Sequence, residues 1–251
     1  MATTIVVAGK GGTGKTTVSS LLVQLLSQKG VVLAIDADPA TNLHQALGVP
    51  LDQTIGAIRE EMTEAVMRGA ISPAVSKQEY LDSRIMAALV EAKRFDLLAM
   101  GRPEGPGCYC AANHMLRLSI DRFGHNYDYV VIDSEAGMEH ISRQTTRDVD
   151  ILLIVSDVTQ RGIYTAAEIK RLIGEMRTRV GKICLVVNRS TNGLPPEIEK
   201  AIESHGFELV ARIPRDEQLS IMDVKGLPVT DLPEDSVLRT AMRELMGKVG
   251  L

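Results

Sequence analysis

The chain has no tryptophan, and aromatic residues make up only 3% of its 251 residues. Surfaces that stack the bases of single-stranded nucleic acids depend on aromatic side chains, so we do not expect this kind of binding. An excess of positive charge is also missing, because 28 Lys and Arg face 32 Asp and Glu, a formal net charge of -4. A nonspecific nucleic-acid binder needs a basic surface. The composition therefore argues against a nucleic-acid partner.

Long apolar runs and a disulfide framework are missing as well. No apolar run approaches the about 20 residues that a transmembrane helix needs. The first residues, MATTIVVAGK, carry no basic segment before their apolar run, so they do not resemble a secretion signal. Three cysteines cannot form a paired framework, and they suit a reducing compartment. We therefore expect a cytoplasmic protein without a membrane span.

Short apolar segments alternate with longer amphipathic ones along almost the whole chain. Most of the short segments are continuously apolar, which is typical of strands buried on both faces; they are 3–8, 31–36, 95–100, 127–133, 150–157, 182–188 and 207–214. A helical pattern runs from Val18 toward a stop at Gly30, and others cover 56–68, 77–93, 137–147, 160–178, 195–204 and 234–247. This alternation predicts one α/β domain over residues 1–251, with a doubly wound, mainly parallel sheet of seven or eight strands flanked by helices.

The segment GKGGTGKTT, from Gly9 to Thr17, is the strongest indication of function. It matches the pattern G-x-x-x-x-G-K-S/T, directly after a predicted strand and before a predicted helix. Such a loop points backbone N–H groups at phosphate oxygens beside a helix N-terminus. The residues expected to bind ATP or ADP here are Gly9, Gly11, Gly12, Thr13, Gly14, Lys15, Thr16 and Thr17. Lys15 is expected to bridge the β- and γ-phosphates, and the Thr16 hydroxyl to ligate Mg²⁺.

Two predicted strands end in acidic residues, at the edge where parallel sheets bind ligands. The second strand ends at Asp36, shortly before Asp38, and the fourth ends at Asp133. An apolar run closed by Asp is the Walker B form, so Asp133 is a candidate ligand of Mg²⁺ or of its waters. Asp36 is a second candidate for the Mg²⁺ shell, and it could instead cap the helix that follows.

Cys108 and Cys110 stand in the turn-forming segment GPGCYC, where we expect exposed thiols, whereas Cys184 lies in the apolar strand KICLVVN. Four interpretations of the pair remain open: incidental surface cysteines, a redox pair, half of an iron–sulfur site, or half of a mononuclear metal site. A disulfide between residues this close is strained. Two thiolates fill half of a tetrahedral metal site, and a two-fold axis at this segment would supply the other half.

A second lysine, Lys10, follows Gly9, and GKGGTGKTT thereby resembles the deviant Walker A loop of the MinD/ParA/nitrogenase-iron-protein class of dimerising ATPases. The resemblance implies that ATP closes a homodimer in which Lys10 reaches the partner subunit's phosphates and speeds hydrolysis. The alternative is a solvated loop lysine. The resemblance also implies that Asp38, in DADP, positions or deprotonates the attacking water. Gly137, four residues after Asp133, would contact the γ-phosphate.

The resemblance extends to the adenine side and to the cysteines. It implies adenine contacts from four residues that follow the sixth and seventh strands: Asn188, Arg189, Pro214 and Arg215. The triplet CYC, with DADP and AGMEH, is similar to the CooC-type accessory ATPases, which support nickel insertion into carbon monoxide dehydrogenase or acetyl-CoA synthase. This similarity implies Ni²⁺, or Zn²⁺, at Cys108 and Cys110 across a homodimer, and one of those two enzymes as client.

Two alternative functions remain. A spatial regulator of the MinD or ParA kind would use the nucleotide to control attachment to membrane or DNA. Its membrane contact could be the amphipathic C-terminal segment 234–248, although we favour packing of this segment on the sheet. An iron–sulfur carrier would hold a cluster at the cysteine pair.

Overall fold

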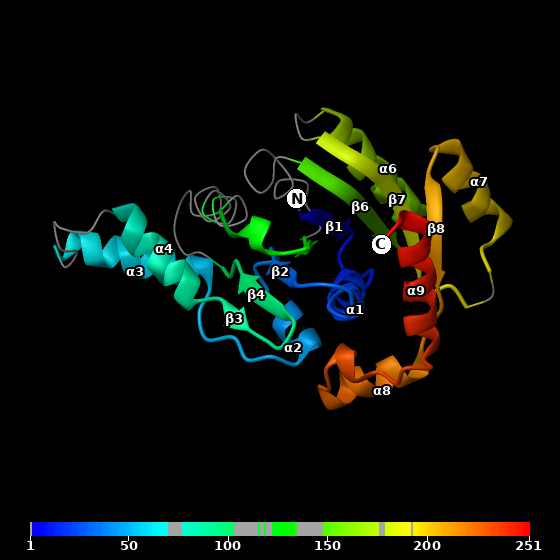
Figure 1. Cartoon of the computed structure of the whole chain (residues 1–251). Helices are drawn as coiled ribbons and strands as arrows, with labels where there is room; N and C mark the ends of the chain where they lie inside the picture. The colour runs from blue at the N-terminus through cyan, green and yellow to red at the C-terminus, as the bar shows by residue number, and fades with distance from the viewer. Residues whose placement is uncertain are drawn as a thin grey trace.

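The computed structural model describes residues 2–69, 77–102, 115, 118, 122–134, 148–175, 179–191 and 193–251. Within these ranges, eight strands form one sheet in the order β3-β4-β2-β5-β1-β6-β7-β8 (Figure 1). Every neighbouring pair is parallel except β3 and β4. The predicted fold class, a mainly parallel sheet flanked by helices, is therefore confirmed.

The elements have the following bounds. The strands are β1 (Thr3–Gly9), β2 (Val32–Asp36), β3 (Val90–Glu91), β4 (Phe95–Ala99), β5 (Tyr129–Asp133), β6 (Asp148–Ser156), β7 (Arg179–Asn188) and β8 (Glu208–Ile213). The helices are α1 (Lys15–Leu26), α2 (Leu43–Leu47), α3 (Ile55–Met67), α4 (Lys77–Ala87), α6 (Gln160–Glu175), α7 (Pro196–Ser204), α8 (Glu217–Lys225) and α9 (Val237–Val249). Short 3-10 helices are η1 (Gly124–Asn126) and η2 (Val229–Asp231). All seven predicted strands are present, and the helix predicted over 137–147 lies outside the described residues.

The sheet is buried on both faces, as β1 shows. Ile5 and Val7 pack into one apolar cluster with side chains of α1 and α9, whereas Val6 and Ala8 pack into a second cluster with side chains of α3, α6 and α7. Because successive side chains of a strand point to opposite faces, a strand between two helical layers must be apolar at every position. This explains the continuously apolar segments of the sequence.

The helix predicted over 77–93 is too long. It ends at Ala87, and Val90–Glu91 instead forms β3, which pairs antiparallel with β4. A hydrogen bond of 2.9 Å from the Ala92 N–H to the Phe95 carbonyl closes the turn between these strands. The backbone of Val90–Glu91 thus pairs with β4 at the sheet edge rather than continuing the helix.

The first helix also ends earlier than predicted, at Leu26 rather than near Gly30. The glycine has another role, because a Cβ at this position would lie 2.4 Å from Oδ2 of Asp128. The same carboxylate accepts the Val31 N–H at 2.9 Å. Gly30 therefore allows the close approach of Asp128 at the start of β2, while its N–H bonds the carbonyl of Leu26, the last residue of α1, at 3.0 Å.

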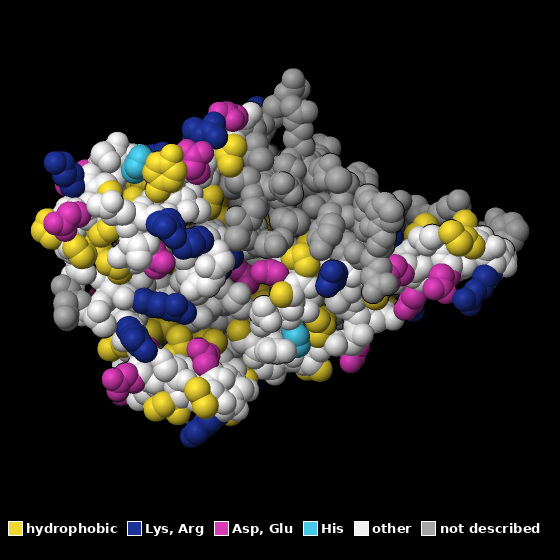
Figure 2. Space-filling view, turned by 180° about the vertical axis from the view of Figure 1, so that it is seen from behind, with side chains coloured by type: hydrophobic (Ala, Val, Ile, Leu, Met, Phe, Trp, Pro, Cys, Tyr) yellow, Lys and Arg dark blue, Asp and Glu magenta, His cyan; other side chains and the backbone are white. Residues whose placement is uncertain are grey.

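Helices α3 and α4 project from the rest of the molecule (Figures 1 and 2). They belong to the long connection between β2 and β4, which are direct neighbours in the sheet. The base of this hairpin is anchored in the core through Ile55 and Ile58, whereas Met67 at the end of α3 is 81% exposed. The connection therefore leaves the sheet and returns to the adjacent position.

The C-terminal helix α9 lies along β8 (Figure 1). Its apolar face is buried; the residues concerned are Leu238, Ala241, Met242, Leu245, Met246 and Val249. The prediction that this segment packs on the sheet is confirmed. Among the residues that the structure describes, no helix is long and apolar enough to cross a membrane.

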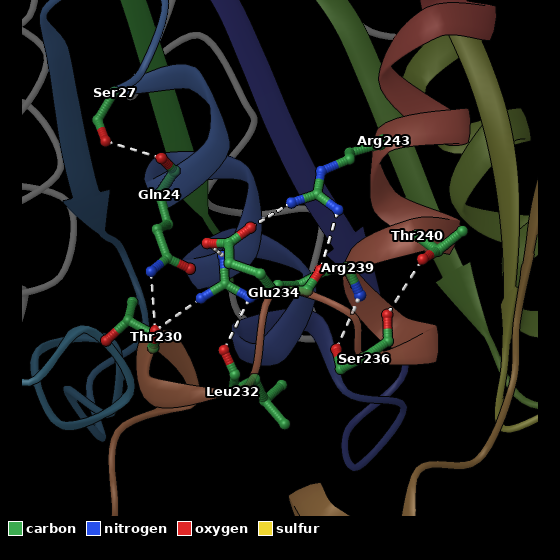
Figure 3. A network of polar contacts seen from close by, with 9 residues as sticks. All are labelled: Gln24, Ser27, Thr230, Leu232, Glu234, Ser236, Arg239, Thr240 and Arg243. Carbon is green, nitrogen blue, oxygen red and sulfur yellow. Dashed lines mark hydrogen bonds and ion pairs between the residues drawn. The ribbon is translucent and has the colours of Figure 1, made fainter.

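A buried arginine joins α9 to the helix that follows the predicted phosphate loop (Figure 3). Arg239 is 2% exposed, and it donates from Nε to the Leu232 carbonyl and from Nη2 to the Thr230 carbonyl, both at 2.9 Å. Its Nη1 pairs with Glu234 at 3.1 Å. The Thr230 carbonyl also accepts from Nε2 of Gln24 on α1, at 2.8 Å. The segment around η2 thus ties α1 to α9.

We expect Arg239→Ala to lower the free energy of unfolding by about 3 kcal/mol, because the Leu232 carbonyl loses a charged donor in a buried setting. Arg243→Ala is the matched control: Arg243 pairs with the same Glu234, but its side chain is 46% exposed. That variant should change stability by less than about 0.5 kcal/mol. Urea denaturation of both variants measures the difference, and equal losses would contradict the structural role of Arg239.

Candidate nucleotide-binding site

The predicted site residues meet at the carboxyl ends of the central strands. Asp133 at the end of β5 is in register with Val7 of β1 and with Asp36 at the end of β2. The loop from β1 to α1 begins at the same edge. Ligands of open parallel sheets bind at this edge, where the chain connections diverge to either side. The topology thus brings the two acidic strand ends beside the glycine-rich loop.

The loop between β1 and α1 is organised around the carbonyl of Lys10. This oxygen accepts from the Thr13 hydroxyl at 2.8 Å, from the Thr13 N–H at 3.4 Å, and from Nζ of Lys15 at 3.4 Å. Gly14 caps α1 in the left-handed conformation, with φ 89°. Lys15, the first residue of α1, is 8% exposed. The contacts of Lys10 that shape the loop are therefore made by its backbone.

Gly9 is required by close packing against the neighbouring strand. A Cβ at this position would lie 2.2 Å from the carbonyl oxygen of Val155 on β6. The Gly9 φ of 149° is also a conformation that residues with a side chain rarely adopt. The first glycine of the motif therefore lets β1 run beside β6 up to the start of the loop.

The buried carboxylate of Asp133 holds the first turn of α1. Its Oδ2 accepts from the Thr16 hydroxyl at 2.7 Å, and its Oδ1 accepts from the Ser19 hydroxyl at 3.0 Å. Ser19 is fully buried and was not among the predicted site residues. Its spacing of three residues from Thr16, on one helix face, is the signal that could have identified it.

Asp36 accepts two backbone hydrogen bonds, from the Leu43 N–H at 2.9 Å and from the Asp38 N–H at 3.1 Å. Leu43 is the first residue of α2, whose N-cap is Asn42, so the Asp36 carboxylate bonds the first N–H of the helix that follows. Asp38 is half-buried, and its Oδ1 accepts from the Ala40 N–H at 2.9 Å. Asp36 thus orders the segment that carries Asp38.

Burial raises the pKa of both strand-end carboxyls. Desolvation raises the pKa of Asp36 to about 7, with the Asp133 charge adding to it and the hydrogen bond from Leu43 opposing it. Desolvation raises the pKa of Asp133 to about 6, against the hydrogen bonds from Thr16 and Ser19 and the charge of Lys15. Two buried carboxyls beside a hydroxyl form an oxygen donor set of the kind that Mg²⁺ prefers. Thr16 and Asp133 would hold Mg²⁺, together with Asp36 on the neighbouring strand. The bound ion would neutralise phosphate charge.

Among the cavities beside the start of α1, two are lined by both Gly14 and Arg189. One, of about 370 Å³, is lined by Gly11, Gly12, Gly14, Lys15, Thr16, Asp38, Asn42 and Arg189. The other, of about 470 Å³, is lined by Gly14, Thr17, Asn188, Arg189, Thr191, Pro214, Arg215, Asp216, Leu219, Ser220, Asp223 and Leu238. We call them the phosphate cavity and the nucleoside cavity, after the predicted roles of their residues. Gly14 and Arg189 line both cavities, so the two are adjacent.

The nucleoside cavity collects the four residues for which adenine contacts were predicted, together with others that were not. Asp216 is 8% exposed, and its Oδ1 caps α8 by accepting from the Gln218 N–H at 2.8 Å and the Leu219 N–H at 3.3 Å. Asp at an N-cap is a recognised signal, but it identifies a site only where the following helix is itself predicted, and α8 was not. Three predicted site residues lie outside the described part of the chain: Cys108, Cys110 and Gly137. Cys184 is buried in β7, as expected.

Comparison with known proteins places this site in a family. A family model described as an AAA domain matches residues 1–185. An uncharacterized ATP-binding protein of Methanocaldococcus jannaschii is 42% identical over 250 residues, 98% of this chain and 97% of that protein. The septum site-determining protein MinD of Pyrococcus horikoshii, solved in complex with Mg-ADP, shares the fold with a TM-score of 0.72 at 22% identity, over 99% of this chain and 96% of that one. The chain belongs to this AAA domain family and is a P-loop ATPase that shares the fold of MinD.

This P-loop ATPase is also similar to a protein with a narrower description. The carbon monoxide dehydrogenase accessory protein CooC of Rhodospirillum rubrum is 33% identical over 239 residues, 91% of this chain and 89% of that protein. The similarity therefore extends well beyond the phosphate loop of the ATPase.

Proposed function

We propose that this ATPase is a cytoplasmic nickel chaperone of the CooC type. It would form an ATP-dependent homodimer that holds Ni²⁺, or Zn²⁺, between subunits and supports metal insertion into carbon monoxide dehydrogenase or acetyl-CoA synthase. The observation that carries the proposal is the 33% identity to CooC over 91% of this chain, together with the triplet Cys108-Tyr109-Cys110. Two copies of the triplet about a two-fold axis supply the four thiolates of a complete metal site.

The phosphate cavity supports the hydrolytic part of this proposal. Lys15 and the loop N–H groups would hold the phosphates, and Asp38 lines the same cavity, where it would orient the attacking water. The half-buried Lys10 would supply positive charge to the partner subunit's nucleotide. Hydrolysis would then depend on dimerisation, and metal and nucleotide would favour the same dimeric state.

The metal site is tested by replacing Cys108 and Cys110 together with serine. We expect the unchanged protein to bind about one Ni²⁺ per two chains and the double variant to bind none, since four thiolates form one site. Cys184→Ala is the control, because Cys184 is buried in β7 and should not contribute to the site. Equilibrium dialysis with metal analysis measures the stoichiometry. The affinity for ADP should stay within about twofold, because the phosphate loop does not include these cysteines.

Nickel binding that persists in the double variant would contradict the proposal. A brown, cluster-containing protein after anaerobic reconstitution, without nickel binding, would favour an iron–sulfur carrier instead. Burial of the apolar face of α9 in the core argues against the membrane contact that the spatial-regulator alternative would make through this helix.

A further inference from the structure

Asn188, at the end of β7, is bonded to the phosphate loop. Its Nδ2 donates to the Thr13 carbonyl at 2.8 Å, although the two residues are 175 positions apart in the sequence. Its Oδ1 accepts from the Arg189 N–H at 2.8 Å. Asn188 is 7% exposed and Thr13 is 2% exposed, so the contact between them is shielded from water. A shielded hydrogen bond of this length fixes the loop to β7.

The orientation of this amide has one solution. One end of the Asn188 side chain faces a carbonyl oxygen, which can only accept, and the other end faces an N–H group, which can only donate. A flipped amide would place oxygen against oxygen and N–H against N–H. The donor therefore always faces Thr13.

Gly14 provides the space for this amide. A Cβ at Gly14 would lie 2.3 Å from Nδ2 of Asn188, and the glycine φ of 89° is strained for any other residue. The glycine that precedes Lys15 thus serves the packing of Asn188 against the start of α1. The amide touches the loop at two consecutive residues, Thr13 and Gly14.

The residue that orients the amide is itself held in an unusual backbone conformation. Arg189 has a φ of 60°, in the left-handed region that costs a non-glycine residue about 1 kcal/mol. Such strain persists where the surrounding structure enforces it, and it is concentrated at functional sites. Here the strained residue supplies the N–H that holds Asn188 and lines both cavities.

We infer that Asn188 is a positioning residue for the phosphate loop. By holding the Thr13 carbonyl it fixes the loop in one conformation before the nucleotide arrives, so that less order has to be gained on binding. This role concerns the phosphates and is separate from the adenine contact predicted for the same side chain. The second Nδ2 proton and the remaining Oδ1 lone pair are still available for hydrogen bonds to adenine.

A ligand without a base separates the two roles. We would measure the affinity of Mg·tripolyphosphate by calorimetry for the unchanged protein, Asn188→Ala and Asn188→Leu, the latter retaining most of the side-chain volume. Both variants should bind it at least about tenfold more weakly, because each loses one shielded hydrogen bond. Ser190→Ala is the matched control, because Ser190 is also 7% exposed and its hydroxyl bonds the nearby Gly193 carbonyl, at 2.8 Å, rather than the phosphate loop. Its affinity should stay within about twofold of the unchanged protein.

Hydrogen exchange in the absence of ligand gives a second readout that does not need tight binding. The amides of residues 13 to 16 should exchange at least about tenfold faster in Asn188→Ala, while those of β1 and β5 remain protected. Unchanged exchange in the loop would overturn the inference. So would unchanged tripolyphosphate affinity with weakened ADP binding, which would make Asn188 a base contact only. If the alanine variant does not fold, both measurements are made on the leucine variant.

Discussion

Lys10→Ala should lower ATP turnover by at least about 100-fold and leave ATP affinity within about threefold, because charge supplied to the transferring phosphate acts mainly in the transition state. In this structure the substitution should remove the side-chain charge and leave the backbone contacts of the loop in place. All three hydrogen bonds that Lys10 makes within the loop involve its carbonyl oxygen, which alanine retains. The loop geometry should therefore survive the loss of the side chain. Steady-state turnover and ATP titration of the same preparation measure the two effects.

Mixing two inactive variants tests whether Lys10 acts on the partner subunit. Asp38→Ala should also abolish turnover, since Asp38 lines the phosphate cavity. In a mixed dimer the Lys10→Ala chain keeps Asp38 and receives an intact lysine from its partner, so one of two sites is complete. An equal mixture should recover roughly a quarter of the original activity, because half of randomly formed dimers are mixed. Absence of recovery, with mixed dimers present by native mass spectrometry, would show that Lys10 acts within its own subunit.

Asp133→Asn should have opposite effects on stability and on activity. Since the folded pKa of Asp133 is about 6 against an ordinary value of 3.8, the folded protein holds this proton more tightly than the unfolded chain. The free energy of unfolding therefore falls as pH rises from about 4 to above 6. Asparagine removes the buried charge, and the Thr16 and Ser19 hydroxyls can bond its amide as donor or acceptor. We expect the variant's stability advantage to grow by about 2 kcal/mol between about pH 4.5 and about pH 8.

The same variant should lose at least about 100-fold in Mg·ATP turnover, because a neutral amide is a poor substitute for a carboxylate near Mg²⁺. Urea denaturation of the nucleotide-free protein across this pH range measures the first effect. Asp52→Asn, at an exposed position away from the site, is the control and should change neither quantity. A stability advantage that does not depend on pH would contradict the assignment of the raised pKa to Asp133.

The sheet and the phosphate loop were predictable because they rest on local patterns. Burial between two helical layers requires an apolar side chain at every strand position, so the seven longer strands stand out in the sequence. The two-residue strand β3 is too short for such a pattern. Helix α8 is missed for another reason: Met222 is its only buried residue, so it lacks an apolar stripe.

The contacts that complete the site were not predictable, because they join distant parts of the chain. The spacing of Ser19 from Thr16 indicates a shared helix face but not the partner Asp133, and nothing near Asn188 in the sequence indicates a bond to Thr13. Strand order and register create these pairs, because they bring the end of β5 to α1 and the end of β7 to the loop before α1. Sequence patterns predicted which residues lie at the sheet edge, whereas the fold decides which of them touch.

The crossover over residues 37–94 has a consequence for how this protein can diverge. It starts beside the nucleotide site at Asp38 and ends at β4, whose register with β2 is set by their own backbone pairing. The entropic cost of a loop grows only slowly with its length. Residues can therefore be added to or removed from α3 and α4 without shifting a single strand pair. The projecting hairpin is therefore a module whose length and surface can change during evolution while the ATPase beneath it stays constant.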